Sequence, residues 1–473
     1  MRGMLRKVEA ATEFLNAVNH SIDIDGIAQG RPATLADLKP YADCDESRLP
    51  WLGPVPAHWD FLRAKYLFRE VNERSVDGKE ELLSVSHLTG VTPRSQKTVT
   101  MFLAKSNVGY KICRPGDVAI NTMWAWMGAL GVARHTGIVS PAYGVYRPLA
   151  GCAVLPEYAD YLLRTPAYAA EYLRRSTGVN SSRLRLYPEE FLRIEVAVPP
   201  HGEQAAIVRF LDHATASFDR FIRAKKKQAL SVSELRQSIT EEALRGPDTK
   251  SVRLEVAAEV VERPIDRERH HVYTPVGLFN RGRGIFHKQP TKGADLGDSD
   301  FYWIEGGDLV ISGQFAWEGA IALARNQDAG CVASHRYPIL RGRAEAVSSP
   351  VLLAFFRTQF GALLLDQHSR GAAGRNRPLN IASLLKEKIP VPPPSAQRRI
   401  TELVQFEAQI TDCFGRITEA VREYRTCLIS GVVTGQLDIR EAARSLPDEV
   451  GLLEVQESDD EAEEIAEAVE ENE

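Results

Sequence analysis

The feature that most constrains this chain is an uninterrupted stretch with helical periodicity over residues 198–246. Two prolines open the stretch, a glycine closes it, and no proline lies between His201 and Arg245. At 1.5 Å per residue, a helix of this length extends for about 65 Å. Its residues on one face recur at alternating steps of four and three, which is the heptad spacing of a coiled coil. These predicted contact positions are Ile207, Leu211, Ala214, Phe218, Phe221, Lys225, Gln228, Val232, Leu235 and Ile239.

The chain contains an internal repeat with a period near 190 residues, so the long helix has a counterpart. Residues 116–120 (GDVAI) return as 307–311 (GDLVI) at an offset of 191, and residues 140–143 (SPAY) return as 334–337 (SHRY) at an offset of 194. The proline motif 196–200 with Gln204 returns as 389–393 with Gln397. A period of this length indicates a duplicated unit of a domain plus a helix.

The second copy of the helix is predicted over residues 395–431, where apolar residues again alternate at steps of three and four. A single chain that returns on itself would pair the two helices antiparallel. The predicted fold class is therefore α+β, with two globular domains separated by two long antiparallel helices that form a coiled coil.

Each globular domain is expected to be rich in β-strands. In the first, candidate strands lie at 82–85, 97–101, 118–121 and 130–133, and a helix is predicted at 157–176 before a short strand at 194–198. The predicted boundaries divide the chain into an N-terminal extension without a readable role (1–48), a first domain (49–198), a central helix (199–246), a second domain (247–391), a C-terminal helix (392–440) and an acidic disordered tail (441–473).

Charge is distributed unevenly along the chain. The net charge is −5, but residues 445–473 hold 13 Asp or Glu and no Lys or Arg, so the rest of the chain carries +8. A basic body makes a polyanion such as nucleic acid a plausible partner, although a mildly basic soluble protein is an equally good explanation of charge alone. The six cysteines are scattered, and no apolar run is long enough for a bilayer or a signal peptide, which favours a cytoplasmic protein with reduced thiols.

The sequence lacks the common catalytic motifs considered below. The chain has no phosphate loop for ATP, no Asn/Asp/Ser-Pro-Pro-aromatic motif of amino-methyltransferases, and no Gly-x-Ser-x-Gly elbow for a nucleophile. Residues 277–284 contain closely spaced glycines, but their spacing predicts only a loop. Asp77-Gly78-Lys79 predicts a turn, and His270, His271 and His287 lack the spacing of a metal site. No catalytic residue, metal or cofactor is predicted in this chain.

Two pairs of loops remain as candidates for DNA binding, because they place the same chemistry at equivalent positions of the repeat. Amide and hydroxyl groups can read adenine, aromatic groups can contact thymine, and arginine can contact phosphate or guanine. The alternative is that the aromatic residues belong to the core, while the Asn- and Arg-containing segments are solvated loops. The candidates in the first half are Asn121, Thr122, Trp124, Trp126, Asn180, Ser182, Arg183 and Arg185. The candidates in the second half are Ser312, Gln314, Trp317, Arg375, Asn376 and Arg377.

The chain resembles the specificity subunits of Type I restriction-modification systems. The resemblance rests on residues 49–59 (LPWLGPVPAHW), the two Gly-Asp strands, and residues 185–212 (RLYPEEFLRIEVAVPPHGEQAAIVRFLD). It also rests on residues 377–400 (RPLNIASLLKEKIPVPPPSAQRRI) and the closing 428–440 (LISGVVTGQLDIR). It covers about residues 49 to 440, and it accounts for neither the N-terminal extension nor the acidic tail.

The resemblance implies a DNA-binding subunit without catalytic activity of its own. Its two target-recognition domains would each read one half of a bipartite DNA target, and the helices would dock two modification subunits. Adenine methylation and restriction would then belong to partner subunits, which would hold S-adenosylmethionine, ATP and Mg²⁺. Because the two domains differ strongly in sequence, the target is expected to be asymmetric.

Three alternatives stay open at this point. The same chain would serve a modification-only complex in phage defence, which lacks a restriction subunit. A stand-alone nuclease or fused methyltransferase would act on DNA without partners. A coiled-coil scaffold would show no DNA sequence preference.

Overall fold

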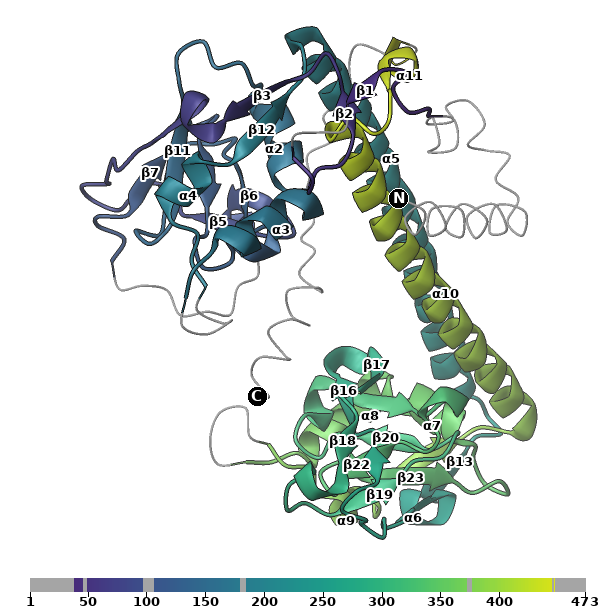
Figure 1. The fold of residues 1–473 in the computed structure, drawn as a ribbon. Helices are drawn as coiled ribbons and strands as arrows, with labels where there is room; N and C mark the ends of the chain where they lie inside the picture. Colours follow the sequence, from purple (N-terminus) through teal and green to yellow (C-terminus); the bar gives the residue numbers. More distant parts are fainter. Residues whose placement is uncertain are drawn as a thin grey trace. The chain divides into compact units, whose positions relative to one another are not determined.

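The computed structural model of the chain describes residues 38–45, 49–96, 106–178, 184–371, 377–444 and 446. Its residues form two compact units (Figure 1). Unit 1 contains residues 1–221 and 418–473, and unit 2 contains residues 222–417. The candidate strand at 97–101, residues 1–37 and 46–48 of the N-terminal extension, and nearly all of the acidic tail lie outside the described residues.

Unit 1 is organised around a four-stranded antiparallel sheet in the order β4-β11-β8-β9. These strands are β4 (Phe68–Glu70), β11 (Gly144–Pro148), β8 (Val118–Ile120) and β9 (Leu130–Val132). Every residue of β8 and β9 is buried, since the two strands are covered on both faces. One face packs on the helices α2 (Pro156–Leu163), α3 (Pro166–Arg175) and α4 (Pro188–Leu192).

The helix predicted at 157–176 is divided into α2 and α3. Pro166 lacks a backbone N–H and disfavours the helical conformation of the residue before it, so the first helix ends and the second begins with proline in its first turn. Thr165, at the break, is buried and has extended backbone angles. The single-helix prediction was therefore wrong at this point.

Shorter elements surround the sheet of unit 1. They are the pairs β1 (Cys44–Asp45) with β2 (Val55–Pro56), β3 (Asp60–Arg63) with β12 (Glu195–Val198), β5 (Leu83–Ser86) with β6 (Gly90–Pro93), and β7 (Lys111–Cys113) with β10 (Gly137–Val139). Three 3₁₀ turns are η1 (Ala64–Tyr66), η2 (Arg94–Gln96) and η3 (Ala125–Met127).

Unit 2 repeats this topology with an antiparallel sheet in the order β14-β23-β20-β21. The strands are β14 (Ala258–Val260), β23 (Ile339–Gly342), β20 (Leu309–Ile311) and β21 (Ile321–Leu323). The helices α7 (Ser349–Phe356), α8 (Gln359–Gln367) and α9 (Ile381–Leu384) stand where α2, α3 and α4 stand in unit 1.

The remaining strand pairs of unit 2 are also antiparallel. They are β13 (Lys250–Arg253) with β24 (Lys388–Val391), β15 (Val272–Tyr273) with β18 (Thr291–Lys292), β16 (Val276–Phe279) with β17 (Gly284–His287), and β19 (Phe301–Trp303) with β22 (Val332–Ser334). The short helical elements are α6 (Leu254–Ala257), η5 (Asn280–Gly282), η6 (Gly293–Asp295), η7 (Ala316–Glu318) and η8 (Asn326–Asp328).

The repeated Gly-Asp pair starts the central strand of each sheet. Gly116 and Gly307 have φ of 88° and 87°, the left-handed region that glycine adopts without steric cost. Asp117 is buried and binds the guanidinium of Arg147 through both carboxylate oxygens, at 2.9 and 2.8 Å. Asp308 is buried in the same position and pairs with arginine as well. The motif is therefore a structural turn with an internal ion pair.

The repeated glutamine fixes the start of each long helix. The side-chain amide of Gln204 donates to the carbonyl oxygens of Ala153 and Pro199, both at 2.8 Å, and its oxygen accepts from Leu155 N. Gln397 makes the corresponding three bonds in unit 2. Because both ends of the amide are used, each glutamine joins its helix to the loop that precedes α2 or α7.

The two long helices are α5 (His201–Leu244) and α10 (Pro394–Val433), and they pack antiparallel (Figure 1). In unit 1 the rings of Phe218 and Tyr424 meet edge to face with centroids 5.5 Å apart. In unit 2, Arg236 Nε lies 2.7 Å from Glu407 Oε2. The antiparallel helix pair predicted from the two heptad stretches is confirmed. A short α11 (Arg440–Arg444) follows α10.

The contact face of α5 departs from the predicted heptad positions in unit 2. Leu235 is 52% exposed and Gln228 is exposed, whereas Arg236 is only 3% exposed and Thr240 is buried. Arg236 enters the interface because Glu407 supplies a carboxylate there, and Arg357 also lies 3.5 Å from the same carboxylate oxygen. A polar network therefore replaces leucine at this level of the helix pair.

No helix in the described part of the chain is both long and apolar enough to cross a bilayer.

Candidate DNA interface

The first candidate loop of unit 1 follows β8 and folds as the turn η3. Asn121 is buried: its Oδ1 accepts from Met123 N at 3.3 Å, and its Nδ2 donates to the hydroxyl of Tyr143 at 3.1 Å. Burial raises the pKa of Tyr143, so this phenol stays protonated. Thr122 Oγ1 donates to the carbonyl of Ala142 at 3.1 Å. Both polar side chains thus hold the loop in shape.

The surface of this loop is apolar. Trp124 is 38% exposed, and Met123 and Met127 are exposed to a similar degree. Trp126 is partly buried, and its indole Nε1 donates to Met123 O at 3.0 Å. Sequence reasoning named both tryptophans and missed the two methionines, although they flank the tryptophans in the same short segment. Exposed flexible thioethers beside an indole suit contact with another apolar surface.

The equivalent loop of unit 2 has the same backbone course. Phe315 and Trp124 precede their 3₁₀ turns with φ of −123° and −118°, and Gly319 and Gly128 end the turns with φ of 75° and 84°. The indole of Trp317 donates to Gln314 O at 3.1 Å, just as the indole of Trp126 donates to Met123 O from the same turn position in unit 1. The two loops therefore share their backbone angles and their indole hydrogen bond, although their exposed side chains differ.

The polar candidates of the unit 2 loop are divided between structure and surface. Ser312 is buried, and its hydroxyl accepts from Phe315 N at 3.1 Å, so it serves the turn as Asn121 does. Gln314 and Trp317 are both partly exposed.

The second candidate loop of each unit lies only partly within the described residues. The predicted contacts Asn180, Ser182, Arg183, Arg375 and Asn376 fall outside them.

The described ends of these second loops lie against the first loops. In unit 1, Leu186 N donates to Thr122 O at 2.9 Å, and the guanidinium of the exposed Arg185 lies 3.8 Å from Met123 Sδ. In unit 2, Leu379 N donates to Gly313 O at 2.8 Å. The two loops that sequence reasoning selected separately are therefore joined by a backbone hydrogen bond in each unit.

Arg377 is held in place by three groups. Its guanidinium lies over the indole of Trp317 at 4.7 Å, Nη2 lies 2.8 Å from Asp366 Oδ1, and Nε donates to Ser369 O. The stacking and the ion pair fix the guanidinium plane, and the residue stays partly exposed. Arg377 and Trp317 form one amphipathic surface in unit 2, as Arg185 and Met123 do in unit 1.

The His287, Asp328 and Cys331 group of unit 2 does not assemble an activated nucleophile. His287 Nε2 lies 2.8 Å from Asp328 Oδ1 and 3.8 Å from the sulfur of Cys331, so one nitrogen faces both groups and the imidazole cannot relay a proton between them. Burial raises the pKa of the Cys331 thiol, which disfavours the reactive thiolate. Among described residues no group of three or more His, Cys, Asp or Glu side chains is placed to hold a metal ion.

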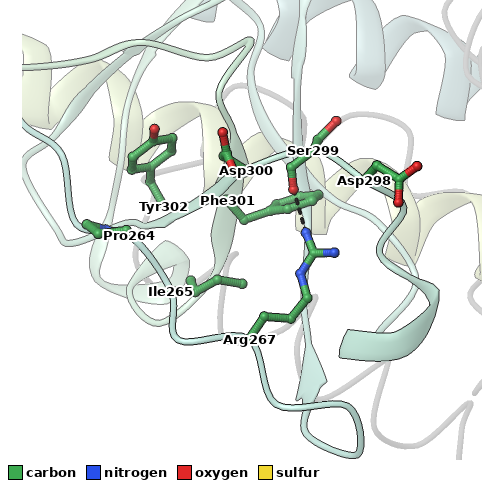
Figure 2. A pocket seen from close by; sticks show the side chains of 8 residues that line it. All are labelled: Pro264, Ile265, Arg267, Asp298, Ser299, Asp300, Phe301 and Tyr302. Atoms are coloured by element: carbon green, nitrogen blue, oxygen red, sulfur yellow. Dashed lines mark hydrogen bonds between the residues drawn. The ribbon is translucent and has the colours of Figure 1, made fainter.

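An open cavity of about 340 Å³ in unit 2 is lined by none of the candidate loop residues (Figure 2). Arg267 lies along its wall, where the guanidinium donates to the carbonyl oxygens of Gly297 and Ser299 and faces the ring of Phe301 at 5.6 Å. The carboxylates of Asp298 and Asp300 also line it. None of the predicted DNA contacts does so.

No protein-family model and no curated protein sequence matches the chain. Solved structures do match it. A chain in a structure titled for complex assembly and conformational transition of the type I R-M system aligns with a TM-score of 0.51 at 16% identity, over 80% of this chain and 98% of that one.

Two further matches have TM-scores below 0.5. The HsdS subunit from Thermoanaerobacter tengcongensis aligns at 18% identity with a TM-score of 0.39, over 81% of this chain and 98% of that one. The S subunit of a type I restriction-modification system from M. genitalium aligns at 12% identity with a TM-score of 0.41, over 79% of this chain and 96% of that one. The first match shows the fold that the sequence resemblance predicted.

Proposed function

We propose that this chain, which has the fold of a Type I restriction-modification specificity subunit, is the DNA-reading subunit of such a complex. It recognises a bipartite, asymmetric duplex target and directs adenine methylation and restriction by partner subunits. The observation that carries the proposal is the junction of the two candidate loops in each unit, made by Leu186 N with Thr122 O and by Leu379 N with Gly313 O. One duplicated fold presents two such surfaces.

The two surfaces differ in chemistry, which supports an asymmetric target. Unit 1 offers the exposed apolar group of Met123, Trp124 and Met127 beside Arg185, and apolar side chains favour the methyl group of thymine. Unit 2 offers Gln314 and the stacked pair of Trp317 and Arg377, where an amide suits adenine and a guanidinium suits guanine or phosphate. Different half-sites follow from these different groups.

The helix pair supplies the proposed docking surface for two modification subunits. On the part of the pair in unit 2, Leu230, Leu235 and Phe406 are 57%, 52% and 52% exposed. Apolar side chains exposed on a helix pair suit contact with another protein. In this proposal the partners hold S-adenosylmethionine, ATP and Mg²⁺, and this chain contributes no reacting group.

The decisive experiment is methylome sequencing of the source strain, with and without a disrupted gene for this chain. The expected result is a split, asymmetric methyladenine motif that disappears on disruption. The purified chain alone, with S-adenosylmethionine or Mg²⁺ and plasmid DNA, is expected to give neither methylation nor nicking. Either activity without partners would overturn the proposal in favour of an enzyme.

A modification-only complex in phage defence is the second candidate, since it would use the same surfaces. It is distinguished by the plating efficiency of phage on cells that carry the complete gene cluster, combined with sequencing of the neighbouring reading frames. A translocase-nuclease gene and cleavage of unmodified DNA favour restriction, and methylation without cleavage favours modification alone.

A further inference from the structure

The tip of the β16–β17 hairpin holds an arginine in a backbone conformation that residues other than glycine rarely adopt. Arg281, within η5, has φ 57° and ψ 30°. Among the described residues it is the one non-glycine residue with positive φ. The left-handed region is unfavourable for a residue with a Cβ atom, and such residues persist where the surroundings or a function hold them.

Neighbouring groups hold this tip from both sides. Gly282 N donates to Gly319 O of the candidate loop at 2.8 Å, and Gly282 O accepts from Arg357 Nη2 at 2.6 Å. Asn280 Nδ2 donates to Glu318 Oε2 at 2.5 Å. The hairpin tip is therefore fixed against the same loop that carries Trp317.

Arg357 is itself anchored and does not act as a surface charge. Its guanidinium lies 3.5 Å from Glu407 on α10, and burial lowers its pKa. The contact of Arg357 with the hairpin tip is called the clamp below. It has a counterpart in unit 1, where Arg164 Nη2 donates to the carbonyl oxygens of His87 and Leu88 at the tip of the β5–β6 hairpin. The clamp is thus a repeated structural device, while the residue it presents differs between the units.

The guanidinium of Arg281 is exposed, and within the described part of the chain it makes no hydrogen bond or ion pair. The backbone of Arg281 lies beside Gly319 of the candidate loop, and no described contact gives its guanidinium a structural role. The corresponding position of unit 1, counted from the left-handed glycines Gly90 and Gly282, is Thr89. A contact made by Arg281 would therefore be specific to unit 2.

We infer that the β16–β17 hairpin tip is a third DNA-contacting element of unit 2, with Arg281 as its contact residue. This inference rests on the proposed function and extends it to a residue outside the two candidate loops. A guanidinium offers paired donors to a backbone phosphate or to O6 and N7 of guanine. The fixed tip holds the start of the side chain in one place, which reduces the entropy lost when the contact forms.

The test uses the full-length chain assembled with cognate modification subunits. A random duplex library selected on the wild-type complex supplies the target, and binding is measured against salt concentration and against single-base variants of each half-site. Arg281→Gly removes the guanidinium and suits the left-handed backbone. Arg281→Lys keeps the charge. Arg343→Ala removes one exposed positive charge just beyond the far end of β23, where Arg343 lies 3.8 Å from the exposed Glu259, and serves as the control.

Arg281→Gly is expected to weaken target binding about 5- to 150-fold, the range of one good contact, with an unfolding midpoint no lower than that of the wild type. If the contact is to phosphate, Arg281→Lys rescues binding and Arg281→Gly reduces the salt slope by about one without changing base preference. If the contact is to guanine, Arg281→Lys fails to rescue and selectivity relaxes at one base of one half-site.

Arg343→Ala is expected to leave target binding within about twofold of the wild type, because a single exposed charge far from the proposed DNA-contacting surface contributes little to binding. The inference would be overturned if the Arg281→Gly and Arg343→Ala complexes had the same affinity, salt slope and base selectivity. If the wild-type complex is still selective in that experiment, the proposed function stands. Absence of sequence selectivity in the wild-type complex would overturn both.

Discussion

At the scale of single residues, the buried polar groups of the chain are structural, and the candidate contacts are the side chains left outside. Asn121 and Ser312 follow the two central strands, but both are buried and accept hydrogen bonds from their own loops, and Asn121 also donates to Tyr143. Trp124, Arg185 and Arg377 keep part of their surface exposed. The sequence analysis named buried structural side chains and exposed candidate contacts together. A single sequence does not distinguish an amide that stabilises a turn from an amide that contacts a base.

The Gly-Asp ion pair provides a test at this scale. Asp117→Asn removes the buried carboxylate that binds Arg147 and leaves only the longer pair with Glu73 at 3.5 Å. It is expected to destabilise unit 1 by about 2–3 kcal/mol, somewhat less than the loss of a fully buried pair, because Arg147 is 21% exposed. Urea denaturation of the full chain, followed by tryptophan fluorescence, measures the loss. Asp77→Asn, which affects the exposed pair with Lys79, serves as control with an expected loss below about 1 kcal/mol. Equal losses would show that the buried pair has no special role.

At the scale of elements, the long helices need each other, and their interface changes character along its length. Aromatic and aliphatic groups meet in unit 1, where Phe218 packs on Tyr424. Arg236, Glu407 and Arg357 form a polar network in unit 2. Heptad spacing predicted the pairing, but it placed Leu235 in the interface and could not anticipate that a carboxylate of α10 would draw Arg236 inward.

Phe218→Pro tests whether the helix pair is needed for assembly. Proline removes a backbone hydrogen bond and clashes with the preceding turn, at a cost of about 3 kcal/mol or more in a helix interior. We expect loss of helical signal in circular dichroism and loss of complex formation with modification subunits in size-exclusion chromatography. Phe218→Leu keeps the helix and removes only the ring contact, so it should still assemble. Assembly by the proline variant would show that an unbroken helix is unnecessary.

At the scale of the whole molecule, duplication gives two units with one framework, which we propose to be two readers of DNA. The strand orders β4-β11-β8-β9 and β14-β23-β20-β21 match, and Gln204 and Gln397 fix the long helices in the same way. The exposed groups of the two units differ. Variants in one unit are therefore expected to affect one half of the target.

A crossed pair of variants tests this independence. Arg377→Ala should weaken discrimination in one half-site by about 1–3 kcal/mol, and Trp124→Ala should weaken contact with the other half-site and spare the first. Binding to targets with a mismatch in either half measures both effects in the same complex. Loss shared equally between the half-sites by both variants would contradict two independent readers.

The sequence by itself determined the duplicated units, the long helices and the turn at each Gly-Asp pair, because heptad spacing, proline and glycine act on local backbone. The apolar pattern predicted one helix over 157–176, and the structure divides it at Pro166. Tertiary structure alone decided which loops meet, which polar groups are buried, and that Arg281 stands free on a clamped hairpin. Those features depend on partners far away in the chain, such as Arg357 with Gly282 and Arg236 with Glu407, and no local pattern encodes such pairings.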